Sequence, residues 1–182
     1  MRVCSVIVVL IGLCLGACAK TRLVQMPPSG PDWQRIDAAY VSAVQAANDS
    51  GEQSWQSGWL GNVWVNYFPK GSAGLCYQWQ DLVFNAVARE AKSSPWKVGG
   101  IQVNKGTSKE HHAVLLYPAA TAEPVKLGDL AGKGGSGAWV LDPWLRGTAD
   151  VYVLQEWLKA RPGGGADAAF EELPHPDGRT IR

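Results

Sequence analysis

The sequence predicts one α+β domain, and three observations favour that class. Apolar residues recur at helical spacing in two long segments, 31–48 and 75–92. Short apolar runs bounded by glycine, asparagine and proline follow them, as is typical of strands. The chain has 182 residues, 46% hydrophobic and 18% charged, which suits one globular domain and excludes a disordered protein or a coiled coil.

Two helices are predicted in the first half of the chain. The first begins at Pro31 and ends before Gly51, and its apolar face carries Ile36, Tyr40, Val44 and Ala47. The segment 54–68 holds three of the nine tryptophans and gives no clear periodicity. The turn-rich loop 69–74 then precedes a second helix, 75–92, whose apolar face carries Cys76, Trp79, Val83, Ala86 and Val87.

Strands and a third helix are predicted in the second half. The strands cover 96–104, where Gly99 and Gly100 interrupt the run, 112–117 and 138–141, with a glycine- and lysine-rich loop at 127–137. The third helix covers 149–160, with the apolar stripe Val151, Leu154, Trp157 and Leu158. Because glycine and proline recur after it, we expect the domain to cover 31–161 and a flexible tail to cover 162–182.

The N-terminus predicts a targeting segment. A positive Met1-Arg2 precedes an apolar run too short to span a bilayer comfortably, so residues 1–17 are typical of a secretory signal peptide. Leu15-Gly16-Ala17-Cys18 resembles the lipobox of bacterial lipoproteins, which implies that Cys18 is lipidated, as by palmitate. The alternative is an ordinary signal peptide with a chance cysteine. Residues 18–30 are polar with two prolines and are predicted to be a tether.

The charge balance limits the partners. Lys and Arg number 17 and Asp and Glu number 16, so there is no basic surface for nucleic acid or for anionic lipid. A membrane partner is therefore expected only through the anchor on Cys18. Ala19, rather than Asp, follows that cysteine, and by the lipoprotein resemblance this favours the periplasmic face of the outer membrane over the inner membrane. We expect a monomer.

Cys76 is the cysteine of interest. Of four cysteines, Cys4 and Cys14 lie in the signal segment and Cys18 takes the lipid, so Cys76 has no disulfide partner. A lone thiol is either a buried small hydrophobic group or a reactive one. Its place at the start of a predicted helix favours reactivity, because a helix N-terminus lowers the pKa of a thiol.

A thiolate nucleophile needs a base, and the chain has three histidines. His175 lies in the predicted tail. His111 and His112 stand at the start of an apolar strand and can present a ring to a helix packed on the sheet. Asp142 ends the next strand before Pro143, where it is either a turn former or the group that orients an imidazole.

Three motifs in this order resemble the papain and transglutaminase-like superfamily. Residues 74–79 (GLCYQW) resemble its nucleophile helix, residues 112–115 (HAVL) its histidine strand, and residues 139–144 (WVLDPW) its aspartate strand. The resemblance implies a compact transglutaminase-like (papain-like) core, with the nucleophile helix packed on a small antiparallel sheet. It covers 74–144 and departs from the family in having two adjacent histidines.

The resemblance implies that Cys76 is the nucleophile, His112 the base and Asp142 the orienting carboxylate. Successive strand residues face opposite sides, so only one histidine can reach the thiol, and His111 is the alternative base. The backbone N–H of Cys76 is one candidate oxyanion donor. The second candidate is an upstream side chain, Trp64 or Asn66.

These residues lead to two hypotheses of different classes. The first is a lipid-anchored thiol hydrolase or acyl transferase, such as a cysteine peptidase or amidase, acting on a carboxamide of a peptide or protein in the cell envelope. The second is a non-catalytic lipoprotein of the same fold that binds a peptide or glycan in a tryptophan-lined cleft. The cysteine, histidine and aspartate positions lack zinc-site spacing and no phosphate-binding loop follows a strand, so we expect neither a metal nor a cofactor.

Overall fold

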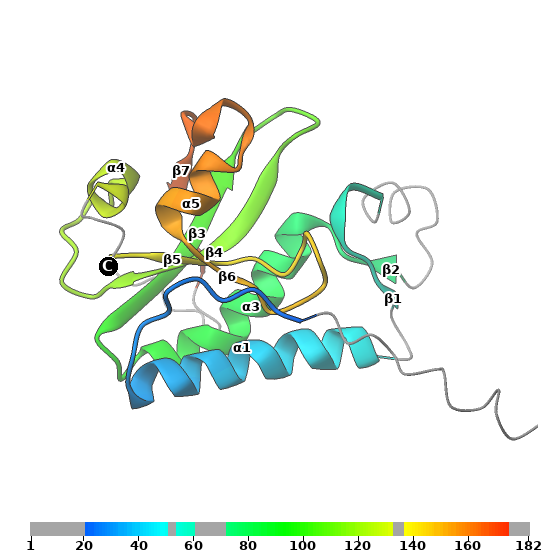
Figure 1. Cartoon of the computed structure of the whole chain (residues 1–182), viewed down its shortest axis with the longest axis horizontal. Coiled ribbons are helices and arrows are strands. Elements are labelled where there is room, and N and C mark those ends of the chain that lie inside the picture. Colours follow the sequence, from blue (N-terminus) through cyan, green and yellow to red (C-terminus); the bar gives the residue numbers. More distant parts are fainter. Residues whose placement is uncertain (1–20, 51–53, 61–71, 133–136, 175–182) are drawn as a thin grey trace, which may run out of the picture.

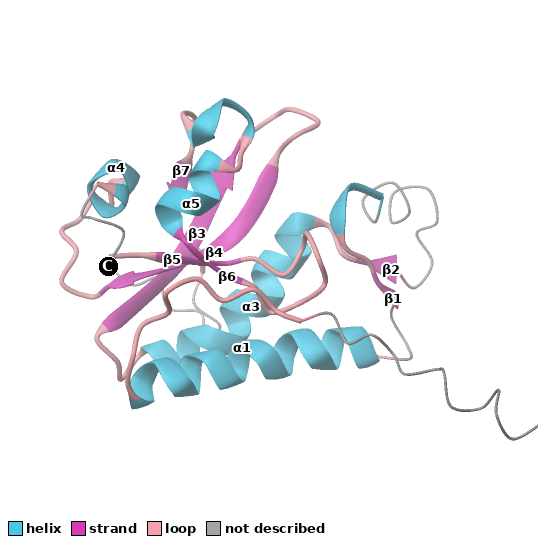
Figure 2. Cartoon of the chain, viewed as in Figure 1, coloured by secondary structure: helices cyan, strands magenta, loops and turns pink. Residues whose placement is uncertain are grey.

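Five antiparallel strands form an open sheet with helices on both faces (Figures 1 and 2). The computed structural model describes residues 21–50, 54–60, 72–132 and 137–174. The helical elements are α1 (Pro31–Asp49), α3 (Cys76–Ala91), α4 (Leu127–Ala131), α5 (Leu154–Lys159) and the 3-10 turn η1 (Pro162–Gly165). The sheet has the order β6 (Val151–Val153), β5 (Trp139–Leu141), β4 (His111–Pro118), β3 (Trp96–Val103) and β7 (Ala169–Glu171). A separate parallel pair joins β1 (Ser54–Trp55) to β2 (Ser72–Ala73).

The two long helices pack side by side on one face of the sheet, and α5 lies on the other (Figure 1). The predicted apolar face of α1 is confirmed, since Ile36, Tyr40, Val44 and Ala47 are all buried against α3 and the sheet. The opposite layer buries Leu154 and Trp157 of α5. The α+β class is therefore confirmed, with an antiparallel sheet between two helical layers.

Two glycines in β3 allow neighbouring elements to come close to the sheet. The strand runs without interruption through Gly99 and Gly100, which corrects the predicted break. A Cβ on Gly100 would lie 2.6 Å from Nε2 of Gln80 in α3. A Cβ on Gly99 would collide with the ring of Phe170 in β7. The glycines therefore mark close packing rather than a turn.

Two predictions for the C-terminal part are wrong. The third predicted helix starts late, because Val151 and Val153 are buried in β6 beside β5 and only Leu154 begins α5. The predicted tail from Pro162 is also folded as far as residue 174, since η1 leads into β7, which pairs with β3 at the edge of the sheet. Single-residue alternation over three residues is too short a signal to distinguish these strands from helix or tail.

The N-terminal segment 21–30 is packed against the domain, unlike the predicted tether. Val24 forms a parallel bridge with Val151 at the free edge of β6. The backbone N–H of Leu23 donates to Asp150 at 2.8 Å. Arg22 pairs with Asp37 of α1 through hydrogen bonds of 2.6 and 3.0 Å. No helix within the described residues is long and apolar enough to cross a membrane.

Candidate active site

The loop before α3 fixes where that helix begins. Gly74 has a φ of +133°, and a Cβ there would collide with the backbone of Gln56, so only glycine fits this close approach. The side chain of Gln78 accepts the backbone N–H groups of Gly74 and Leu75 at 2.9 and 3.0 Å. This cap makes Cys76 the first residue of α3.

The Cys76 thiol is buried and lies against the start of β4. Its sulfur donates to the carbonyl oxygen of Glu110 at 3.8 Å. Burial raises the pKa of the Cys76 thiol, while the backbone N–H groups of His112 and Tyr77 near the sulfur act in the opposite direction. The lowering of the thiol pKa expected from the helix N-terminus is therefore outweighed by desolvation.

His111 and Asp142 form a buried pair. Nε2 of His111 lies 2.7 Å from Oδ2 of Asp142, and the side chains are 4% and 0% exposed. The carboxylate also accepts the indole N–H of Trp157 at 2.8 Å and the backbone N–H of Trp144 at 3.2 Å. Burial on its own raises the pKa of Asp142, but the charge and hydrogen bond of His111 hold it below its ordinary value.

The other nitrogen of the His111 ring makes no hydrogen bond. Nδ1 is buried and has no hydrogen-bond partner. The ring packs between Trp144 and Trp157, with centroids 4.6 and 5.7 Å away, so its orientation is fixed. When Nε2 carries the proton donated to the Asp142 carboxylate, Nδ1 presents its lone pair.

His112 is in a different environment, and its expected pairing with Asp142 is wrong. Its Nε2 lies 2.8 Å from Oε1 of Glu110 and its Nδ1 lies 3.1 Å from Oε2 of Glu171. The hydrogen bond that His112 donates to Glu171, supported by the one it donates to Glu110, raises the pKa of His112 despite partial burial. An imidazolium that donates from both nitrogens has no lone pair for a thiol proton.

The strand geometry explains why Asp142 pairs with His111 rather than with His112. His111 and His112 are adjacent in β4, so their side chains lie on opposite faces of the sheet. His112 faces α3, where Gln80 donates to Glu171 at 3.0 Å. Asp142 follows β5, the neighbour of β4, and points to the face that carries His111.

The remaining predicted site residues lie outside the described residues. These are the candidate oxyanion donors Trp64 and Asn66, the lipidation candidate Cys18, and His175. Within the described parts of the chain, no group of three or more His, Cys, Asp or Glu side chains could hold a metal ion.

Sequence reasoning missed four residues that shape the site. Trp157 and Arg161 contact Asp142, and Glu110 and Glu171 hold His112. Only Glu110 had a local signal, as an acidic residue two positions before His112. Trp157 lies in a segment predicted to be a plain helix, Glu171 in the predicted tail, and Arg161 between the two.

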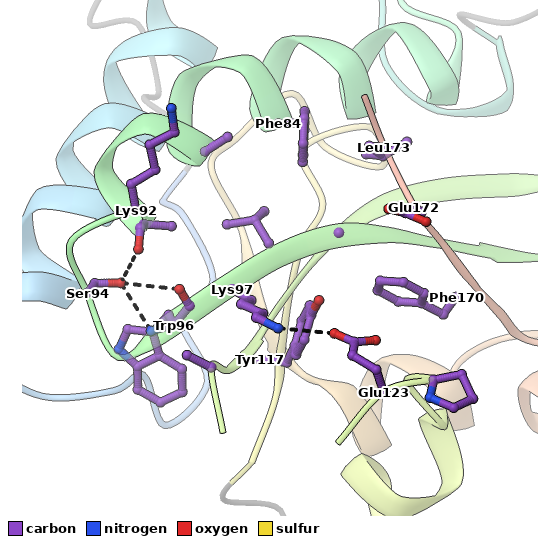
Figure 3. Close-up of a pocket in the computed structure, with 16 residues that line it drawn as sticks. Phe84, Lys92, Ser94, Trp96, Lys97, Tyr117, Glu123, Phe170, Glu172 and Leu173 are labelled. Atoms are coloured by element: carbon purple, nitrogen blue, oxygen red, sulfur yellow. Dashed lines mark hydrogen bonds and ion pairs between the residues drawn. The ribbon is translucent and has the colours of Figure 1, made fainter. Parts of the chain in front are cut away.

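Two cavities differ in chemistry. A cavity of about 190 Å³ adjoins the site and is lined by His111, Trp144 and Arg161 among others. A larger cavity of about 970 Å³ lies between the C-terminal half of α3 and strands β3 and β7 (Figure 3). Its walls include Phe84 and Phe170, and none of its lining residues is Cys, His or Asp. Of these two cavities, the small one is therefore the one lined by His111, and Cys76 lines neither.

Comparisons with known proteins give no assignment. A scan against protein-family models, a search of curated proteins and a search of solved structures each found no match.

Proposed function

We propose that this protein is a thiol hydrolase or acyl transferase that acts on carboxamides. Cys76 is the nucleophile, His111 the general base and acid, and Asp142 the group that orients His111. The observation that carries the proposal is the buried His111–Asp142 pair, which leaves Nδ1 of His111 without a partner in a chain whose described residues hold one free cysteine, Cys76. His111 thus replaces His112 as the proposed base.

The reaction starts from the neutral thiol, because burial raises the pKa of Cys76. For this step the Cys76 sulfur must leave the Glu110 carbonyl and reach Nδ1 of His111, which takes its proton as the S–C bond to the amide carbon forms. Asp142 stabilises the resulting imidazolium. When the tetrahedral intermediate collapses, the C–N bond breaks, His111 gives its proton to the leaving amine, and an acyl-thioester remains on Cys76.

Water or an amine then resolves the thioester. His111 removes a proton from the incoming nucleophile, the S–C bond breaks, and the proton returns to the sulfur. Water gives a carboxylic acid and an amine gives a new amide. The carbonyl oxygen becomes an anion in both steps, and the backbone N–H of Cys76, the first of α3, is placed where a helix has donors without helical acceptors.

The topology supports a transglutaminase-like core as part of this proposal. The helix that begins with Cys76 packs on an antiparallel sheet. The proposed base and its carboxylate come from the neighbouring strands β4 and β5. The chain order cysteine, histidine, aspartate is the order in which the resembled superfamily carries its triad.

We also infer that the enzyme is held in the cell envelope by a lipid on Cys18, on the periplasmic face of the outer membrane. Only Ala19 and Lys20 separate Cys18 from Thr21, where the packed segment begins. An extended chain advances at most about 3.6 Å per residue, so the anchor would hold the domain within roughly 11 Å of the lipid. Detergent partitioning of the protein and of Cys18→Ala tests this, because only the lipidated form enters the detergent phase.

The catalytic proposal is tested by trapping the thioester. The protein is mixed with p-nitrophenyl acetate and then digested. Mass spectrometry of the fragments locates the acetylated residue. We expect an acetyl group on Cys76 that turns over in the unmodified protein. In His111→Ala, acylation should be slower and any acyl-enzyme formed should persist, because both steps use the same base. His112→Ala is the matched control and should acylate and turn over.

Two outcomes would oppose the proposal. Absence of acylation at Cys76 in folded protein would favour the non-catalytic binding lipoprotein. Loss of acylation in His112→Ala, but not in His111→Ala, would return the role of base to His112.

A further inference from the structure

The small cavity beside His111 contains an unusual cation. Arg161 follows α5 and lines the cavity together with His111 and Trp144. Its side chain is 10% exposed, and its guanidinium lies over the Trp157 ring, 4.4 Å from the centroid. A buried guanidinium normally has its N–H groups satisfied by acceptors.

Arg161 lacks such acceptors. The nearest carboxylate oxygen is Oδ2 of Asp142, 3.5 Å away, which is an ion-pair distance rather than a good hydrogen bond. Nε of Arg161 is buried without a partner, and no described residue accepts a hydrogen bond from the guanidinium.

Both carboxylate oxygens of Asp142 already form hydrogen bonds with other groups. Its Oδ2 forms hydrogen bonds with the His111 ring and the Trp157 indole N–H, and its Oδ1 accepts one from the backbone N–H of Trp144. The one acidic residue that lines the cavity, Glu110, is held by His112 and by the backbone of Gly106. The cavity therefore has an arginine with unused donors and no free carboxylate of its own.

We propose that this cavity binds a carboxylate of the substrate through Arg161. The inference rests on the proposed function, and it names the substrate class: amides that carry a free carboxylate. At about 190 Å³ the cavity is smaller than the roughly 300–1,000 Å³ of sites for drug-sized ligands, so it fits one small residue that ends in a carboxylate. The planar fork of arginine suits bidentate recognition of that group.

The carboxylate can belong to a chain terminus or to an acidic side chain. Three ligands separate these sources: N-acetyl-alanyl-alanine, its C-terminal carboxamide, and N-acetyl-alanyl-glutamic acid amide. Their dissociation constants are measured by titration calorimetry with the full chain carrying Cys76→Ala, which prevents turnover. Binding is thereby measured independently of catalysis, and the acylation of Cys76 in the unmodified protein reports on the proposed function separately.

We expect one of the two carboxylates to bind about tenfold or more tightly than the neutral carboxamide, as suits a charged hydrogen bond in a buried site. Arg161→Gln should reduce this preference to less than about twofold. Arg89→Gln is the matched control, since Arg89 carries the same charge, is exposed and lines neither cavity, and it should keep the preference.

Equal binding of the acids and the carboxamide would overturn the proposal and leave Arg161 as a counter-charge for Asp142 only. An unchanged preference in Arg161→Gln would also overturn it. Circular dichroism shows whether Arg161→Gln folds. If it does not, the proposal is decided by the dissociation constants of the two acids and the carboxamide in the chain that keeps Arg161. Arg161→Lys then adds a second measure, because it keeps the charge and should lose part of the preference.

Discussion

His111 and His112 are neighbours in the chain and differ in almost every property that matters for catalysis. His111 meets one carboxylate, Asp142, between two tryptophan rings, and keeps Nδ1 without a partner. His112 meets two carboxylates, Glu110 and Glu171, which bind both of its nitrogens. The first environment suits a general base, and the second favours the protonated ring, which links β4 to Glu171 of β7.

The comparison teaches that a side chain's role is set by partners distant in sequence. Asp142 lies 31 positions after His111, and Glu171 lies 59 positions after His112. One step along a strand turns the side chain to the other face, so neighbouring histidines meet different segments.

The largest expected effect separates the two histidines by catalysis. His111→Ala should lower the rate of p-nitrophenyl acetate hydrolysis by about 10²–10⁴-fold, the usual contribution of a general base. His112→Ala should lower it far less, because its ring has no lone pair to offer. The measurement is kcat/KM for both variants after circular dichroism has confirmed their fold. An equal loss of kcat/KM in the two variants would contradict the different catalytic roles assigned to His111 and His112.

The two carboxylates should also differ in their contribution to stability. Asp142→Ala leaves Arg161 without its counter-charge and the Trp157 N–H without its acceptor, at full burial. We expect it to lower the free energy of unfolding by about 3–5 kcal/mol. Glu171→Ala, at a half-buried site, should lower it by about 1–3 kcal/mol. Urea unfolding of both variants measures this, and a larger loss for Glu171→Ala would contradict it.

The pH dependence of stability should report on His112. The folded-state pKa of His112 is raised, so its stabilising contribution is complete below its unfolded value of about 6.5 and is lost as the pH rises through the folded value. The pKa values of Glu110 and Glu171 are lowered, so their contribution is present above about 4.3 and is lost as the pH falls through the folded values.

These three groups should therefore stabilise the fold most between about pH 4.3 and 6.5. Urea unfolding across pH 3–9, compared between the unmodified protein and His112→Gln, measures the contribution. His112→Gln should remove the decline on the alkaline side. An unchanged decline would show that His112 is not the titrating group.

The smallest expected effect concerns the thiol. Because burial raises the pKa of Cys76, the rate of its alkylation by iodoacetamide should rise with a midpoint above the free-thiol value of about 8.5. Replacing His112 by Ala should move the midpoint little, since the part of His112 near the sulfur is its backbone N–H. A midpoint well below 8.5 would instead indicate a thiolate–imidazolium pair at rest.

Much of the architecture was predictable because it depends on local periodicity. The apolar stripe of α1, the start of α3 at a glycine loop, and the apolar cores of β3, β4 and β5 are visible in the sequence. The short elements β6 and β7 and the packing of segment 21–30 were not predictable. Each is stabilised by pairing with a distant strand or loop, and three residues carry too little pattern to reveal it.

By itself, the sequence determined the reactive types and their order: one cysteine at a helix start, two histidines at a strand start, and one aspartate after the next strand. It also determined that only one histidine could meet the aspartate, because the pleat alternates. The tertiary structure decided which one. Only the register of β4 against β5 places Asp142 beside His111, and β7 brings Glu171 to His112 on the opposite face.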